Sequence, residues 1–151
     1  MIDDKLSRRI LIAAAILGAA GVAIGAYGTH GLERFLVVRG LDSETIAKRV
    51  VQFEIGARYQ LIHAVALFAL ASIPYGSPAN RRWTAGLFVG GIILFSGSLY
   101  VLVLTNTPKL GAVTPIGGLA WILGWLSLIL IAQKRRIQSW ASGETWSNDP
   151  K

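Results

Sequence analysis

The stretch G-A-Y-G-T-H-G, from Gly25 to Gly31, ends the first apolar run of the chain and decides between two folds. A phosphate-binding loop needs a strand before it and a helix after it, and the P-loop type also carries a lysine. Here an apolar, helix-like run comes first and the stretch contains no lysine. On a helix, the small residues of this run fall within roughly 80° of one another. They are Ala14, Gly18, Gly21, Gly25 and Gly28. This pattern predicts a membrane helix that packs closely against a neighbour.

The composition agrees with a membrane protein. Of the 151 residues, 53% are hydrophobic and only 15% are charged, with a mean hydropathy of +0.53. The chain has no cysteine, which excludes disulfides, thiolate zinc sites and cysteine nucleophiles. The net charge of +7 sits in short basic clusters beside apolar runs. We therefore expect no nucleic-acid partner, because this placement is typical of membrane orientation signals.

Four apolar runs predict four spans, at about residues 10–28, 58–74, 83–105 and 113–133. The fold expected is all-α, an integral membrane four-helix bundle, with one domain over residues 1–137 and a polar tail over 138–151. The first run also resembles a signal peptide, with a basic start and small residues near Ala23. We favour a retained span because its glycine pattern has a packing role.

The connection before the second span predicts an amphipathic helical extension. Asp42 can cap a helix, and Ile46, Val50, Phe53 and Ala57 recur on one face. We expect one long helix from Glu44 to Ile73, which lies outside the membrane first and then enters it.

The distribution of basic residues predicts the orientation. Four spans place both termini on one side, and tight Lys/Arg clusters mark the termini and the connection between the second and third spans. We expect both termini to lie in the cytoplasm. The long first connection, which mixes basic and acidic residues, blurs this signal.

Small residues recur on the other spans as well. The third run has three glycines on one face and the fourth has a small-residue flank, while Trp121 and Trp125 are interpreted as lipid-facing or core bulk. The glycines predicted to pack between helices are Gly18, Gly21, Gly25, Gly28, Gly86, Gly90, Gly97, Gly117 and Gly124.

Few polar residues could carry chemistry near the membrane. An ionisable group there is a functional candidate. For a histidine, the structural alternative is a neutral imidazole that is hydrogen-bonded to a neighbouring helix. The candidates are His30, Tyr59, Gln60, His63, Ser96, Ser98 and Thr114. Thr114 and Pro115 also suit the start of a helix. We predict no catalytic set, no cofactor and no metal, since nothing requires the two histidines to converge with an acid.

Four motifs, taken in order, resemble a known family. They are Gly25-Ala-Tyr-Gly-Thr-His-Gly-Leu32, Arg58-Tyr-Gln-Leu-Ile-His-Ala64, Ser96-Gly-Ser-Leu-Tyr100 and Leu110-Gly-Ala-Val-Thr-Pro-Ile-Gly-Gly118. Over about residues 10 to 135, the chain resembles the YgdD/YwdK family of small bacterial inner-membrane proteins. The resemblance implies four spans, an unestablished function and no catalytic residues. The chain departs from the family pattern at Thr29, at the insert from Val37 to Asp42 and in the tail after Ile137.

Two functions follow as expectations. The first is a non-enzymatic structural or accessory subunit of a larger membrane complex, with the lipid bilayer as its surroundings. The second is a homo-oligomeric channel or carrier for a small solute or ion, with Tyr59, Gln60 and His63 facing a polar path. An enzyme ranks third.

Overall fold

The computed structural model describes residues 4–74 and 76–141, with side chains for residues 5–74 and 76–132. This part of the chain is helical and contains no strand, so the all-α prediction is confirmed. The elements are α1 (Asp4–His30), α2 (Leu32–Val38), α3 (Ser43–Ser72), α4 (Pro78–Gly91), the π-helix η1 (Ile92–Gly97), α5 (Ser98–Thr105), the 3-10 helix η2 (Pro108–Ala112) and α6 (Thr114–Ala141).

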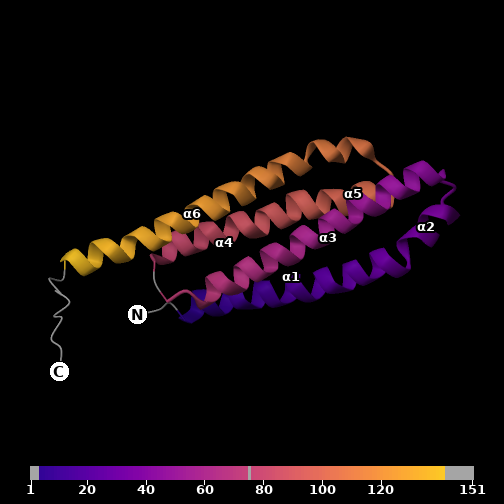
Figure 1. The fold of residues 1–151 in the computed structure, drawn as a ribbon. Helices are drawn as coiled ribbons and strands as arrows, with labels where there is room; N and C mark the ends of the chain where they lie inside the picture. Colours follow the sequence, from indigo (N-terminus) through magenta and orange to yellow (C-terminus); the bar gives the residue numbers. More distant parts are fainter. Residues whose placement is uncertain (1–3, 75, 142–151) are drawn as a thin grey trace, which may run out of the picture.

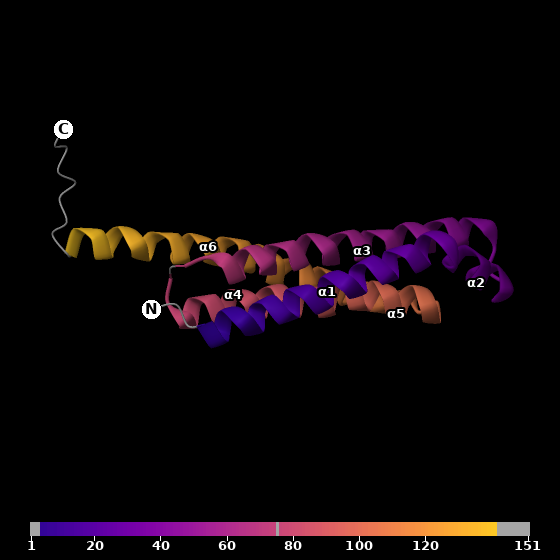
Figure 2. The same cartoon turned by 90° about the horizontal axis from the view of Figure 1, so that it is seen from below.

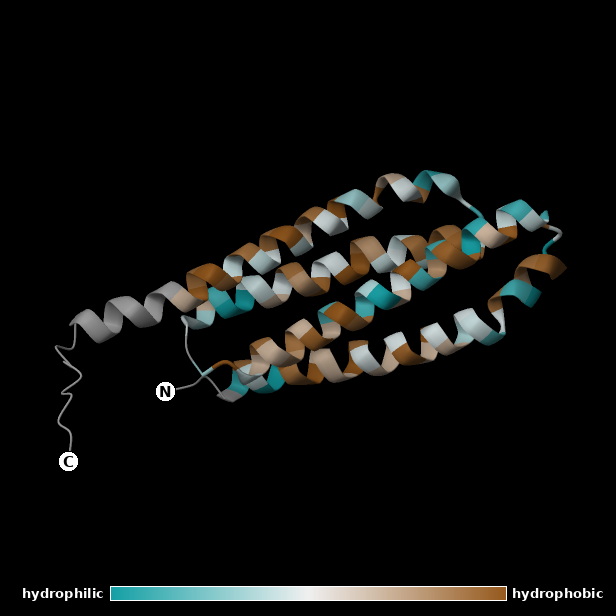
Figure 3. Ribbon diagram, viewed as in Figure 1, coloured by the Kyte–Doolittle hydropathy of each residue, from teal (hydrophilic) through white to brown (hydrophobic). Residues whose placement is uncertain are grey.

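Four helical stretches of the described chain are long and apolar enough to cross a membrane. They are Lys5–His30, Ser43–Ser72, Pro78–Thr105 and Pro108–Ala132, and an 18-residue window within each has a mean hydropathy of 2.2, 1.3, 2.3 and 2.0, respectively. The third stretch joins α4, η1 and α5 into one rod (Figure 1). Hydrophobic residues are frequent along all four stretches, and hydrophilic residues lie at several helix ends and also partway along α3 (Figure 3). Each predicted span lies inside one of these stretches, apart from the ends of the second and fourth.

The rods form an elongated bundle. α1 packs along α3, α3 packs on α4, η1 and α5, and α6 packs on α4 and η1. The start of α1, the start of α4 and the far end of α6 point to the same end of the bundle (Figures 1 and 2). We call this the terminal end. The opposite end, which holds α2, the start of α3 and η2, is called the connection end.

The long helix before and through the second span is confirmed. The Asp42 carboxylate accepts a hydrogen bond from the Thr45 backbone N–H at 2.9 Å and so caps α3, which runs unbroken from Ser43 to Ser72. Gly40, with φ of +77°, makes the left-handed turn before it. The helix ends close to the expected Ile73, and Pro74, which follows, cannot continue it.

The extension does not stand alone, because α2 covers it. Leu32 and Leu36 of α2 are fully buried, with Ile46 and Phe53 of α3 in the same apolar cluster. The sequence indicated the apolar face of α3 but did not predict α2. The cluster continues into α5 through Leu102, so the connection end is packed as part of the bundle.

The predicted small-residue flank of α1 faces α3. A Cβ at Gly21 would lie 2.8 Å from Leu61 Cδ2, and one at Gly28 would lie 3.0 Å from Phe53 Cδ1. Gly18 and Gly25 lie opposite Ala64 and Ala57, where an added Cβ would make ordinary contacts. The two backbones therefore approach closely along the α1–α3 contact.

Within the described bundle, the third span does not pack through the predicted glycines. An added Cβ at Gly86 or Gly90 would meet no atom within 4 Å, and one at Gly97 would meet only the Ile92 carbonyl oxygen of its own rod. The glycine that lies against another helix is Gly91, where a Cβ would overlap the Trp121 ring. Gly91 is displaced by about 100° around the helix from Gly90, so the predicted face was the neighbouring one.

On α6, Gly117 and Gly124 lie against the third span. A Cβ at Gly124 would lie 2.9 Å from the Phe88 ring, and one at Gly117 would overlap the backbone of η1 at Phe95. π-turns inside α-helices occur frequently at functional sites. Here the backbone of η1 is closely approached by α6 at Gly117.

α6 runs through Ala141, so the start of the predicted polar tail continues the helix. The remainder of that predicted tail, residues 142–151, lies outside the described residues.

Candidate functional site

His63 lies on α3 with 3% of its surface exposed. Its Nδ1 is 2.8 Å from the Tyr59 carbonyl oxygen, and its Nε2 is 3.3 Å from Nε1 of Trp125 on α6. A carbonyl can only accept and an indole N–H can only donate, so Nδ1 carries the proton and Nε2 accepts. Both partners therefore fit a neutral imidazole.

The His63 ring is part of a stack of aromatic rings between α3 and α6. Its centroid lies 3.8 Å from that of Trp121, with 5° between the planes, and Tyr59 stacks on Trp121 at 5.6 Å. The Trp121 Nε1–H donates to the Phe88 carbonyl oxygen at 3.2 Å. Because Gly91 has no side chain, Trp121 fits flat against the third span. The stack therefore connects α3, α6 and the third span.

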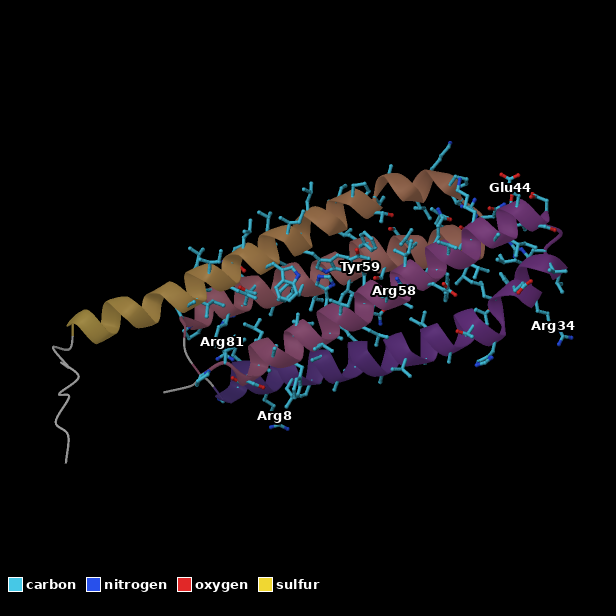
Figure 4. All side chains as sticks on the ribbon, viewed as in Figure 1. Arg8, Arg34, Glu44, Arg58, Tyr59 and Arg81 are labelled. Carbon is cyan, nitrogen blue, oxygen red and sulfur yellow. The ribbon has the colours of Figure 1, made fainter. Side chains whose placement is uncertain are left out.

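Beside the stack lies an open hollow of about 600 Å³, a volume within the range of small-molecule sites. We call it the aromatic groove. It is lined by Tyr59, Ile62, His63, Phe95, Pro115, Gly118, Leu119, Trp121, Ile122 and Trp125. None of these residues is charged at neutral pH when His63 is neutral. Figure 4 marks Tyr59 on α3, where its ring contacts α6.

Gln60 is the centre of a second polar cluster and is 3% exposed. Its Nε2 donates to the Leu17 carbonyl oxygen of α1 at 2.8 Å, and its Oε1 accepts from the Tyr100 hydroxyl of α5 at 2.9 Å. Nearby, the Ser96 hydroxyl donates to the Gly56 carbonyl oxygen at 2.8 Å. These bonds link α3 to α1 and to the third span, and they satisfy both ends of the buried amide.

Two hydroxyl pairs join the third span to α6. The hydroxyls of Ser98 and Thr114 are 2.9 Å apart, and those of Thr84 and Ser127 are 2.7 Å apart. Thr114 is also the first residue of α6, as the sequence indicated. The structure therefore places Gln60, Ser96, Ser98 and Thr114 in contacts between helices, and not along a shared opening.

His30 lies apart from His63. It is exposed and ends α1, just beyond Gly28, which faces Phe53. Phe53 precedes His63 by ten residues on α3, a rise of about 15 Å. Within the described residues, no group of three or more His, Asp or Glu side chains is arranged to hold a metal ion.

Sequence reasoning missed a buried arginine at the connection end. Arg49 is 6% exposed; its Nε and one terminal nitrogen donate to Asn106 Oδ1 at 3.0 and 2.7 Å, and its other terminal nitrogen donates to Gln52 at 2.9 Å. Asn106 has a left-handed φ of 51° and ends α5. Arg49 therefore fixes the end of α5 to α3.

A second buried arginine lies at the terminal end. Arg81 is 3% exposed and donates to the Ser7 hydroxyl at 2.9 Å and to the carbonyl oxygens of Leu70 and Ala71 at 3.2 and 3.3 Å. A guanidinium suits the free carbonyls and negative dipole at the end of α3. In the sequence, Arg81 belongs to the basic cluster between the second and third spans, and its burial was not predictable because its partner Ser7 is distant in the chain. Figure 4 marks Arg81 at this end.

The fold and these contacts define a four-span helical membrane protein whose described intramembrane polar groups bond mainly to neighbouring helices. The chain belongs to the family described as "Protein of unknown function (DUF423)", whose family model matches residues 24–118. The predicted resemblance to the YwdK-like family is thereby confirmed.

Relatives are named as membrane proteins. A UPF0382 membrane protein of Staphylococcus saprophyticus is 38% identical over 80% of this chain and 92% of its own length. UPF0382 membrane protein YwdK of Bacillus subtilis is 36% identical over 82% of this chain and 95% of its own. One from Haemophilus influenzae is 32% identical over 82% and 92%. No solved structure matches the chain.

Proposed function

We propose that this protein is a non-enzymatic accessory subunit that acts through its outer surface on a larger membrane protein. The observation that carries the proposal is the use of the interior polar groups. Gln60, Tyr100 and Ser96 form hydrogen bonds with neighbouring helices of the same chain. In the described interior, these groups build the bundle and are not free to act on a substrate.

The same observation favours an accessory subunit over a channel or carrier made of single bundles. A polar path needs side chains that can exchange their partners with a passing ion or solute. Gln60 is buried and has a partner at each end of its amide. His63 faces the hollow, but both of its ring nitrogens are engaged.

For the location, we propose the bacterial inner membrane with the terminal end in the cytoplasm. Lys5, Arg8, Arg9 and Arg82 lie at that end. The short connection between the third and fourth spans, at the connection end, carries Lys109 as its one basic residue. This difference supports the orientation, because basic residues are retained on the cytoplasmic side.

Native mass spectrometry of the protein extracted gently from its own membranes tests the accessory role. We expect a complex with a larger membrane protein at a fixed ratio. A variant with Ile16→Ala and Val65→Ala, both on outward faces and 64% and 66% exposed, probes whether that surface carries the contact.

A pure homo-oligomer that conducts an ion in planar bilayers would overturn the proposal in favour of the channel. Turnover of any substrate by the isolated chain would overturn its non-enzymatic part.

A further inference from the structure

The aromatic groove lies between α3 and α6, which both pack on η1. α6 packs on α4 and η1, while rings bridge the distance from α6 to α3. Phe95 of η1 forms part of the lining between them. The hollow therefore opens sideways from the bundle at the level of the apolar spans, where hydrocarbon surrounds the protein.

Water is a poor occupant of this groove. An ordered water needs two to four polar partners. Both nitrogens of His63 are engaged, and the Tyr59 hydroxyl is the remaining polar side-chain group, with no hydrogen bond to any described residue. An empty groove would lose the dispersion contacts of its lining. An apolar occupant fits the groove best.

The shape of the groove favours a thin chain over another helix. Membrane helices associate through small residues that let their backbones approach. Here the rim carries bulky side chains, Ile62, Leu119 and Ile122, which are 46%, 60% and 57% exposed. A flexible hydrocarbon chain can lie between them and against the rings, where a helix backbone is held off.

The length of the groove matches one leaflet. Along α6 the lining runs from Pro115 to Trp125, ten residues or about 15 Å, which is half of a hydrocarbon layer about 30 Å thick. Pro115 lies at the connection end, next to η2 and its exposed Lys109. A cation at this end complements the phosphate of a lipid head group.

We propose that the aromatic groove binds one acyl chain of a phospholipid from the leaflet at the connection end. The chain lies along Tyr59, Trp121 and Trp125, and the head group stays at the level of Lys109. This goes beyond the accessory role and does not depend on it, because the groove belongs to a single chain.

The test counts the phospholipids that stay on the protein. The purified chain is mixed with phosphatidylglycerol in detergent, and native mass spectrometry follows retained lipid as the collision energy rises. We expect one phospholipid per chain to remain after the others have left. In nanodiscs containing phospholipid with brominated acyl chains, Trp121 and Trp125 should be quenched at low mole fractions, in a Trp83→Phe, Trp140→Phe, Trp146→Phe background.

Gly118→Leu fills the groove. A Cβ at Gly118 would have an ordinary contact, 3.9 Å from Phe95 Cδ2, so the added side chain can extend into the hollow. Gly86→Leu is the matched control, because it makes the same change where no atom lies within 4 Å. We expect Gly118→Leu to reduce the retained lipid at least tenfold and Gly86→Leu to leave it unchanged. Ile122→Trp, on the rim, should block the groove without altering the core.

Three results would overturn the proposal. One is equal lipid retention by wild type, Gly118→Leu and Ile122→Trp. Another is a second copy of the chain, held in the wild type and released by both groove variants. The third is retention of a lipophile that is not a phospholipid in competition with added phosphatidylglycerol. Loss of the partner complex alone would overturn the accessory role and leave this proposal standing.

Discussion

At the scale of single residues, His63 makes several contacts that connect α3 to α6. Its ring stacks on Trp121, and its nitrogens bond to Tyr59 and Trp125. We expect His63→Ala to lower the free energy of unfolding by about 3 kcal/mol, since it leaves a cavity in a packed stack. Titration with a denaturing detergent in mixed micelles measures this change.

His30→Ala is the control for that measurement. His30 is exposed, and a surface substitution of this kind changes stability by less than about 0.5 kcal/mol. Equal losses at the two histidines would contradict the structural role given to His63.

Gly90 and Gly91 give a second comparison between adjacent residues. A methyl group at Gly91 meets the Trp121 ring, whereas one at Gly90 meets no atom within 4 Å. We expect Gly91→Ala to destabilise the protein by about 1–3 kcal/mol through overpacking. Gly90→Ala should be neutral or stabilising by up to about 1 kcal/mol, because alanine favours the helix. The same detergent titration decides, and the reverse order of the two variants would show that the predicted face packs after all.

At the scale of elements, the start of α3 should respond to acid through Asp42. Backbone and side-chain hydrogen bonds from Thr45 hold the pKa of this carboxyl below its usual value of 3.8. A lowered pKa means that the stabilisation is complete above the unfolded-state pKa and is lost as the pH falls through the folded-state value. The melting temperature of wild type minus that of Asp42→Asn should therefore be constant down to about pH 5 and shrink below pH 4.

The asparagine of Asp42→Asn keeps an acceptor oxygen for the helix cap but does not titrate. The comparison with wild type therefore measures the effect of the Asp42 charge alone. A difference that stays constant through this acid range would show that the Asp42 carboxylate has the same pKa in the folded and unfolded chain.

The elements differ in how far the sequence could predict them. The second span and its extension were predictable as one helix, because a cap, a continuous apolar face and a terminal proline all lie in the local sequence. The face by which α4 packs was not predictable. Gly86 and Gly90 form a regular small-residue pattern, but a pattern on one helix does not indicate which side its neighbours occupy.

In the contact between α3 and α6, only the residues contributed by α3 were predictable as site residues. Tyr59, Gln60 and His63 stood out because polar groups in an apolar run are costly and need partners. Trp121 and Trp125 were interpreted as bulk, because a tryptophan in a span carries no local sign that its ring nitrogen bonds to another helix. The π-turn at η1 lies against Gly117, a contact between residues distant in the chain.

At the scale of the whole molecule, different groups stabilise the ends and the middle of the bundle. Arg49 and Arg81 each join separate helices at opposite ends, where a charged side chain can be close to water. Between them, the neutral side chains of Gln60 and His63 make the helix contacts. This division follows the cost of burying charge in hydrocarbon. For both arginines to be close to water, the two ends of the bundle must lie at opposite surfaces of the membrane.

Single-cysteine labelling tests that arrangement and its direction together. The chain has no cysteine, so each introduced thiol is unique. We place cysteines at Lys5 and Ala79, exposed at the terminal end, and at Arg39 and Lys109, exposed at the connection end. With a membrane-impermeant maleimide on intact cells, Arg39→Cys and Lys109→Cys should react, whereas Lys5→Cys and Ala79→Cys should react only after permeabilisation. The reason is that basic residues near the spans are retained in the cytoplasm, and the terminal end carries more of them in its short segments. The opposite pattern would keep the four-span bundle and reverse its orientation. Labelling of one residue from each end in intact cells would contradict the arrangement itself.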